Sequence, residues 1–171
     1  IAPTMLGTTL RTRTWLVIAG VALLTASAKI QIPLWPVPMT MQTYVVLVIA
    51  MGYGFRLGLL AVGSYLALGA LGFPVFAGTP AQGVGLSYML GPTGGYLAGF
   101  VGATAVCGLL SERGWDRRLI TSLLAMAIGH MVIFAFGVAW LAILVGIVRA
   151  AEVGRLPFVF GTAVKTVLAA V

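Results

Sequence analysis

Residues 119–148 read LITSLLAMAIGHMVIFAFGVAWLAILVGIV, thirty residues without a single Asp, Glu, Lys or Arg. A helix needs only about 20 such residues to cross the hydrocarbon core of a bilayer. This stretch is therefore long enough for a transmembrane helix that is strongly tilted or is broken, and Gly137 marks the expected break. We take it as the segment that decides the fold class.

The composition of the whole chain agrees with a membrane protein. Hydrophobic residues make up 61% of the 171 residues and charged residues only 8%, whereas soluble domains carry roughly 25% charged residues. Transmembrane barrels show segments of about ten residues that alternate apolar and polar, but the apolar runs here are continuous. The sequence therefore predicts an all-α integral membrane protein.

Five further apolar segments accompany residues 119–148. The six segments together predict six transmembrane helices in a single transmembrane domain over residues 1–171. The segments cover residues 15–28, 40–53, 57–71, 91–110 and 119–148, and the last runs from Pro157 to the end. A tight turn at Gly54 separates the second from the third. A proline-rich stretch, residues 32–38, follows the first, and a long uncharged loop, residues 72–90, follows the third.

The basic residues predict the orientation in the membrane. With six spans, one side collects Arg11, Arg13, Arg56, Arg113, Arg117 and Arg118, and the other collects Lys29, Arg149 and Arg155. Because basic loops remain in the cytoplasm, this bias places the N- and C-termini there and both long loops outside. It also explains the net charge of +7 without nucleic acid as a partner.

Lys165 is the most informative single residue. It lies about eight residues into the sixth segment, roughly 12 Å below its start, and a cation at that depth is costly unless it is paired or hydrated. The three acids, Glu112, Asp116 and Glu152, are all expected in loops. Lys165 therefore reads as a ligand contact, although a lysine that reaches back to the interface is the alternative.

Polar side chains open the second segment, where Thr40, Gln42 and Thr43 precede an apolar run. An amide such as that of Gln42 both donates and accepts hydrogen bonds, which suits a ligand with an amide or urea-like group. Helix capping and hydrogen bonding between helices are the alternatives. Tyr96 belongs to a similar glycine-rich opening at residues 91–96, where glycines allow a ligand or neighbour to come close.

The loop at residues 72–90 contains Phe76 and Gly78 and has no charge. Loops longer than about 12–15 residues without secondary structure are often lids, although this loop could merely connect two helices. In the first segment, Ala22 and Ala26 lie four apart, a spacing that lets another helix approach closely, from this chain or from a partner.

The sequence shows no sign of an enzyme or a cofactor. No nucleophile, base or metal cluster is expected at membrane depth, and no phosphate-binding glycine-lysine motif occurs. The single His130 has no nearby acid, so it is better read as a hydrogen-bonded packing residue than as a proton relay.

Four motifs resemble those of the BioY family, the biotin-capturing S components of energy-coupling-factor (ECF) vitamin transporters. They lie at residues 32–43, 69–78, 91–96 and 156–165, in the family's order, and the resemblance covers the chain from about residue 19 to its end. It implies a multi-pass protein of the bacterial cell membrane that binds biotin with high affinity from the outer face. Its implied partners are biotin, the lipid bilayer, a transmembrane coupling protein and paired ATPases.

The resemblance also implies roles for individual residues. The substrate-binding residues would be Thr40, Gln42, Thr43, Phe76, Gly78, Tyr96, Thr162 and Lys165, with Ala22 and Ala26 at the coupling protein. The family's last motif usually has Asp where this chain has Thr162, which removes a charge next to Lys165. The alternatives are a subunit for another vitamin-like solute and a helical subunit that binds no ligand.

Overall fold

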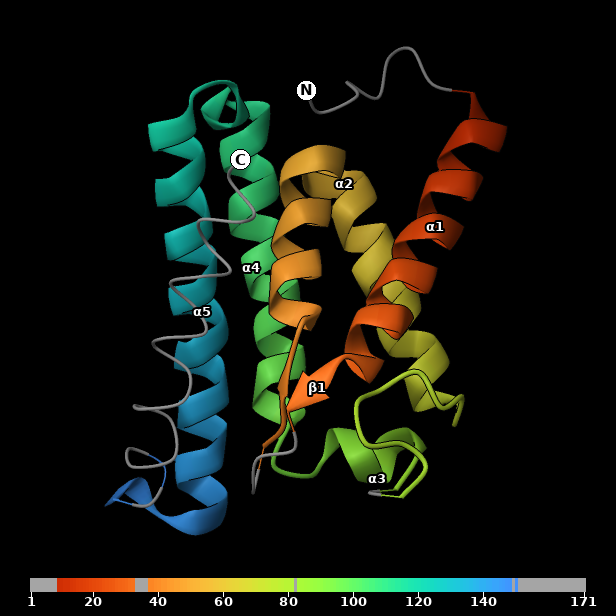
Figure 1. The fold of residues 1–171 in the computed structure, drawn as a ribbon, viewed down its shortest axis with the longest axis vertical. Helices are drawn as coiled ribbons and strands as arrows, with labels where there is room; N and C mark the ends of the chain where they lie inside the picture. Colours follow the sequence, from red (N-terminus) through yellow and green to blue (C-terminus); the bar gives the residue numbers. More distant parts are fainter. Residues whose placement is uncertain (1–8, 33–36, 82, 149, 151–171) are drawn as a thin grey trace.

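A computed structural model describes residues 9–32, 37–81, 83–148 and 150, and these form a helical bundle (Figure 1). Its long helices are α1 (Leu10–Lys29), α2 (Gln42–Ala70), α4 (Gly94–Glu112) and α5 (Leu119–Val145). Its short elements are β1 (Gln31–Ile32), β2 (Met39–Thr40), α3 (Gly85–Met89) and the 3-10 helix η1 (Trp115–Arg117). Within the described residues, α4 and α5 are long and apolar enough to cross a membrane, and so is α2 when its two parts are counted as one helix. The predicted helical membrane fold is confirmed to that extent, while the sixth segment lies outside the described residues.

The helix α2 consists of two arms that meet at Gly54, where φ is 74° and ψ is −173°. The Gln42 side chain donates to the Tyr65 hydroxyl at 2.5 Å although 23 residues separate them, a separation of roughly 35 Å along a straight helix. The arms therefore fold back on each other, and the predicted turn between the second and third segments is confirmed. The Glu112 carboxylate accepts a hydrogen bond at 3.0 Å from the Phe55 N–H, the first of the second arm.

The helix α4 lies between α2 and α5, and its glycines set how closely they pack. A Cβ on Gly108 would lie 2.7 Å from the Phe55 backbone of α2, and one on Gly99 would lie 2.9 Å from the Ile133 backbone of α5. Small residues of this kind let helices approach closely in a membrane, where burial of apolar surface does not drive association. The backbones of α2 and α5 therefore both lie close to that of α4, with little side-chain volume between them.

The fifth segment, expected to be strongly tilted or broken, is not broken at Gly137 but at Gly146. The helix α5 runs without interruption to Val145 and ends at Gly146, whose φ is 86°. Gly137 is buried against the ring of Tyr96, so its missing side chain makes room for an aromatic ring and does not bend the helix. At 27 residues α5 is about 40 Å long, so crossing a core of about 30 Å requires a tilt.

Three short elements at one end of the bundle, β1, β2 and α3, were not predicted from the sequence. The strands β1 and β2 pair antiparallel, with Gln31 opposite Thr40 and Ile32 opposite Met39. The helix α3 interrupts the segment expected to be a structureless loop. All three elements lie at the end of the bundle where α1 finishes (Figure 1).

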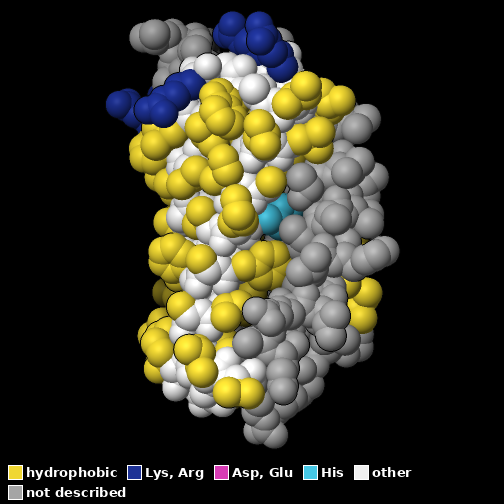
Figure 2. All heavy atoms as spheres, turned by 90° about the vertical axis from the view of Figure 1, so that its left-hand side faces the viewer, with side chains coloured by type: hydrophobic (Ala, Val, Ile, Leu, Met, Phe, Trp, Pro, Cys, Tyr) yellow, Lys and Arg dark blue, Asp and Glu magenta, His cyan; other side chains and the backbone are white. Residues whose placement is uncertain are grey.

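Arginines gather at the opposite end of the bundle. They lie at the start of α1, just after Gly54 and between α4 and α5, ends that Figure 1 shows together. Figure 2 shows basic side chains at one end of a face, and mostly apolar side chains over the rest of its described part. On α5, Leu124, Met131, Phe136 and Ile143 are among the exposed residues, as expected of a helix that contacts lipid. The predicted grouping of six arginines is therefore seen in three dimensions.

Candidate functional site

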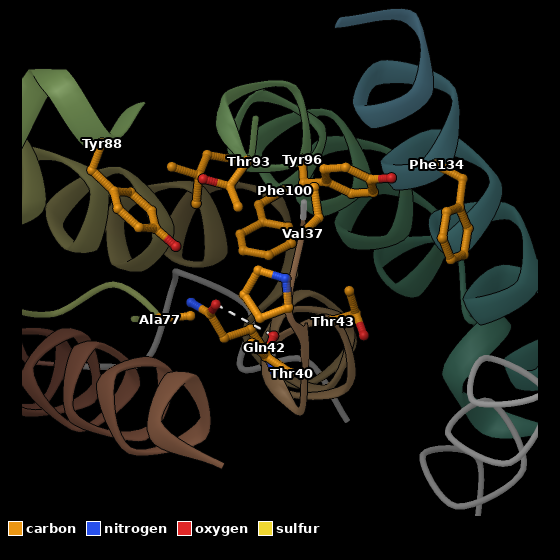
Figure 3. Close-up of a pocket in the computed structure, with 12 residues that line it drawn as sticks. Val37, Thr40, Gln42, Thr43, Ala77, Tyr88, Thr93, Tyr96, Phe100 and Phe134 are labelled. Atoms are coloured by element: carbon orange, nitrogen blue, oxygen red, sulfur yellow. Dashed lines mark hydrogen bonds between the residues drawn. The ribbon is translucent and has the colours of Figure 1, made fainter. Parts of the chain in front are cut away.

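A pocket opens at the end of the bundle where β2, α3 and the start of α4 meet (Figure 3). It holds about 500 Å³ of space, part of which is open to the surroundings. Its described lining residues are Val37, Pro38, Thr40, Gln42, Thr43, Ala77, Tyr88, Thr93, Tyr96, Leu97, Phe100 and Phe134.

The amide of Gln42 is held at both ends. Its nitrogen donates to the Tyr65 hydroxyl at 2.5 Å, and its oxygen accepts from the Thr40 hydroxyl at 3.4 Å, as the dashed line in Figure 3 shows. The side chain is only 4% exposed. Because a buried polar group is costly unless it is hydrogen-bonded, these contacts fix the orientation in which Gln42 meets the pocket.

Tyr65 lies behind the pocket wall and was not predicted from the sequence. Its side chain is fully buried, and its hydroxyl also donates to the carbonyl of Val75 at 3.1 Å. Tyr65 therefore joins Gln42 in the first arm of α2 to the segment that follows the second arm. No sequence signal separates this tyrosine from any other residue of an apolar helix.

Phe76 and Gly78, predicted as site residues, do not line this pocket. The Phe76 ring is fully buried, stacks on Tyr88 at a centroid distance of 5.1 Å and meets Tyr65 edge-on at 5.5 Å. Gly78 occupies a turn with φ of 70°. The residue of this loop that reaches the pocket is Ala77, which lies between them. The ring on which Phe76 stacks, that of Tyr88, does line the pocket.

Tyr88 lies in α3, inside the loop whose length and lack of charge suggested a lid. Burial raises the pKa of its hydroxyl above the ordinary value of 10.0, and a hydrogen bond with Thr93 lowers it in part. Tyr88 is therefore neutral at physiological pH, so its hydroxyl can donate as well as accept. Thr93 belongs to the glycine-rich motif that the sequence did single out, but neither residue was predicted as a contact.

Tyr96 does line the pocket, as predicted for a site residue. It extends from the first turn of α4, fits the space left by Gly137 and meets the Phe134 ring of α5 edge-on at 6.3 Å. The structure thus gathers four predicted residues into one pocket, Thr40 from β2, Gln42 and Thr43 from α2, and Tyr96 from α4. Phe134 was missed because nothing in a uniformly apolar helix marks its pocket-facing position.

The remaining predicted residues fall into two groups. Thr162 and Lys165 lie outside the described residues. Ala22 and Ala26 are both exposed on α1, next to the exposed Leu23. Packing among the residues that the structure describes therefore does not cover them, and a partner helix or lipid can be their neighbour.

The described residues contain no group of three or more His, Cys, Asp or Glu side chains that could hold a metal ion. His130 is 2% exposed, and its Nδ1 lies 3.1 Å from the carbonyl oxygen of Met126 one turn earlier. This contact fits a hydrogen-bonded packing residue.

Comparison with known proteins gives consistent matches over most of the chain. A family model described as the BioY family matches residues 5–171. A probable biotin transporter BioY of Pyrococcus horikoshii is 41% identical over 156 residues, which are 91% of this chain and 90% of the relative. The biotin transporter BioY of Thermotoga maritima is 41% identical over 158 residues, with the same coverage.

A solved structure has a similar fold. It is the crystal structure of the S-component for biotin from an ECF-type ABC transporter, and it matches with a TM-score of 0.81. The match covers 96% of this chain and 91% of that one at 22% identity. The likeness in fold therefore extends over almost the whole of both chains.

Proposed function

The chain belongs to the BioY family, and from this premise we propose that it is a high-affinity biotin-binding S component that captures biotin at the outer face for an ECF-type transporter. The family is a transporter component and not an enzyme. Biotin is then the transported ligand, and no cofactor is required.

The pocket between α2, α3 and α4 is the observation that carries the proposal. Biotin has a urea ring, which donates and accepts hydrogen bonds, and an apolar chain that ends in a carboxylate. The pocket offers the fixed amide of Gln42 together with Thr43 and Tyr96, while Leu97 and Phe100 supply apolar surface. Apolar walls with a few placed polar groups are typical of small-molecule sites.

Two residues of the last segment complete the proposed site. Lys165 would supply a charged donor, and Thr162 a hydroxyl where the family usually has an acid. A cation without an acid next to it favours a ligand that brings its own carboxylate, because an unpaired charge is costly at membrane depth. Biotin carries such a group.

The proposed topology has six transmembrane helices with both termini in the cytoplasm. It is supported by the six arginines at one end of the described bundle and by the pocket at the other. Basic residues favour the cytoplasmic side, so the pocket would face outward in the bacterial cell membrane. The exposed Ala22 and Ala26 would contact the transmembrane coupling protein, which paired ATPases drive.

Ligand binding by the purified full chain tests the proposal. We expect biotin to bind with micromolar or tighter affinity and other vitamins to compete poorly. Preference for another vitamin would support the related-solute alternative, and no binding at all would support the helical subunit without a ligand.

Substitutions test the site itself. Lys165→Ala and Thr43→Val should each weaken biotin binding. Thr25→Val is the matched control, because its hydroxyl only donates to the Val21 carbonyl one turn earlier in α1, at 2.8 Å. Unchanged affinity in Lys165→Ala would remove that residue from the site.

A further inference from the structure

Lys29, the last residue of α1, forms hydrogen bonds to a turn far along the chain. Its ammonium donates to the carbonyl of Phe76 at 3.0 Å, to the carbonyl of Thr79 at 3.3 Å and to the Thr79 hydroxyl at 3.1 Å. A lysine ammonium has three hydrogens to donate, and all three are directed at this turn. Lys29 therefore joins the end of α1 to residues 76–79.

The turn that Lys29 binds, residues 76–79, carries part of the pocket wall. The Thr79 hydroxyl accepts from Lys29 and also donates to the Phe76 carbonyl at 2.6 Å, which closes the turn. Gly78 adopts the positive φ of 70° that this turn requires. Ala77, between Phe76 and Gly78, is 3% exposed and lines the pocket. The position of this wall thus depends on how the turn is held.

The segment is held from two sides that differ in strength. On the inner side, the fully buried Tyr65 donates to the carbonyl of Val75. On the outer side, the Lys29 contacts to Thr79 are exposed, so water competes with them. Local opening begins where hydrogen bonds are exposed and few apolar contacts support them. The Lys29 side is therefore the one that can release first.

We propose that Lys29 is a positioning residue that gates the pocket. Its hydrogen bonds to residues 76–79 keep the wall at Ala77 closed, and loss of these hydrogen bonds opens the path for biotin. The inference rests on the proposed function, because the gated ligand is taken to be biotin. Lys29 is not among the lining residues, so its removal alters the rate of opening and leaves the pocket's own hydrogen-bonding groups in place.

The rates of biotin binding to the purified full chain test this. Lys29→Met keeps an apolar side chain of similar length and removes all three donors. Association and dissociation should both become about three- to tenfold faster, while the dissociation constant changes much less, because a gate limits entry and exit alike. Damage to the pocket would instead raise the dissociation rate without faster association. Lys29→Arg, which keeps the charge, should restore both rates in large part.

Matched variants assign the effect to this contact. Thr79→Val removes one of the three acceptors and should give a smaller rise, and Lys29→Met combined with Thr79→Val should be no faster than Lys29→Met alone. Arg56→Met removes an exposed cation at the opposite end of the bundle and should leave both rates unchanged.

The inference is overturned if Lys29→Met leaves both rates within about twofold of wild type, or if only dissociation is faster. Failure of the wild-type chain to bind biotin is a different result, because it would refute the proposed function.

Discussion

At the scale of single residues, the site depends on side chains behind the pocket as much as on those that line it. Gln42 meets the pocket, but Tyr65 decides which way its amide points. The same phenol holds the carbonyl of Val75, so it links two walls. Polar groups in such a network are costly to leave without a partner in a buried site.

Tyr65→Phe should therefore weaken both the fold and the binding of biotin. The change leaves the Gln42 amide nitrogen and the Val75 carbonyl without the partner seen here, at a cost of about 1–3 kcal/mol. We expect a fall of several degrees in the midpoint of thermal unfolding in detergent, and roughly tenfold weaker biotin binding by calorimetry. Tyr53→Phe, outside the pocket lining, is the control. Equal affinities for the two variants would argue against a fixed Gln42 amide.

Tyr88 predicts a dependence on alkaline pH. Burial raises its pKa in the folded protein above 10.0, so folding favours the protonated phenol. The stability that this provides is fully present below pH 10.0 and is lost as pH rises through the folded-state pKa. Between about pH 6 and 9, the ionisation of Tyr88 should therefore not change the midpoint of thermal unfolding. Above pH 10 the midpoint should fall less in Tyr88→Phe than in the wild type, and an identical fall in both would contradict the burial of this hydroxyl.

At the scale of elements, the turn inside α2 brings the two arms together and so brings Gln42 to Tyr65. The backbone at Gly54 lies in a region that essentially only glycine occupies, with φ of 74° and ψ of −173°. A hydrogen bond from the Phe55 N–H to Glu112 ties the start of the second arm to the end of α4. The turn is therefore fixed by backbone geometry and by a neighbouring helix.

Gly54→Ala should lower the free energy of unfolding by about 1–3 kcal/mol because a Cβ strains this backbone conformation. Gly52→Ala is a matched control two residues away, since an added Cβ there meets nothing within 4 Å and alanine favours a helix by up to about 1 kcal/mol. Thermal unfolding in detergent should move in opposite directions for the two variants. If both variants shifted the midpoint in the same direction, a Cβ added at position 54 would not strain the backbone.

The sequence predicted some elements and missed others for physical reasons. The turn at Gly54 was predictable because a glycine, followed two residues later by Arg56, interrupts a continuous apolar run. The helix α3 and the pairing of β1 with β2 were not, because elements of five and two residues are too short to leave a hydrophobic period. Gly137 was misread as a break, since a sequence does not reveal that the ring of Tyr96 fills the space beside it.

At the scale of the whole molecule, the two ends of the bundle differ in chemistry. The described arginines occupy one end, and the pocket with Lys29 occupies the other. The composition of the chain and the positions of its basic residues predicted this difference between the two ends, because neither depends on how the helices pack. Lining residues of the candidate pocket were predicted only near the start of a helix, as at Gln42 and Tyr96. Contacts that come from the middle of apolar helices, such as Phe134, need the packed structure to be seen.

The exposed alanines of α1 give the last prediction. Ala22 and Ala26 would let a partner helix approach the backbone of α1 closely, and leucine at both positions would hold it away. The doubly substituted chain should bind biotin with wild-type affinity, since neither residue lines the pocket. Uptake of labelled biotin by cells that also express a coupling protein and its ATPases should fall at least about tenfold, a loss of about 1.4 kcal/mol in coupling.

A matched pair on another helix separates partner contact from a general effect of bulk. Ala135 and Ala139 are also exposed and four residues apart, but they lie on α5. Leucine at both should leave uptake unchanged, because extra apolar volume that faces lipid is tolerated while volume inside a helix interface is not. If the two pairs reduced uptake equally, the face of α1 would have no special role, and the coupling protein would have to dock elsewhere on the molecule.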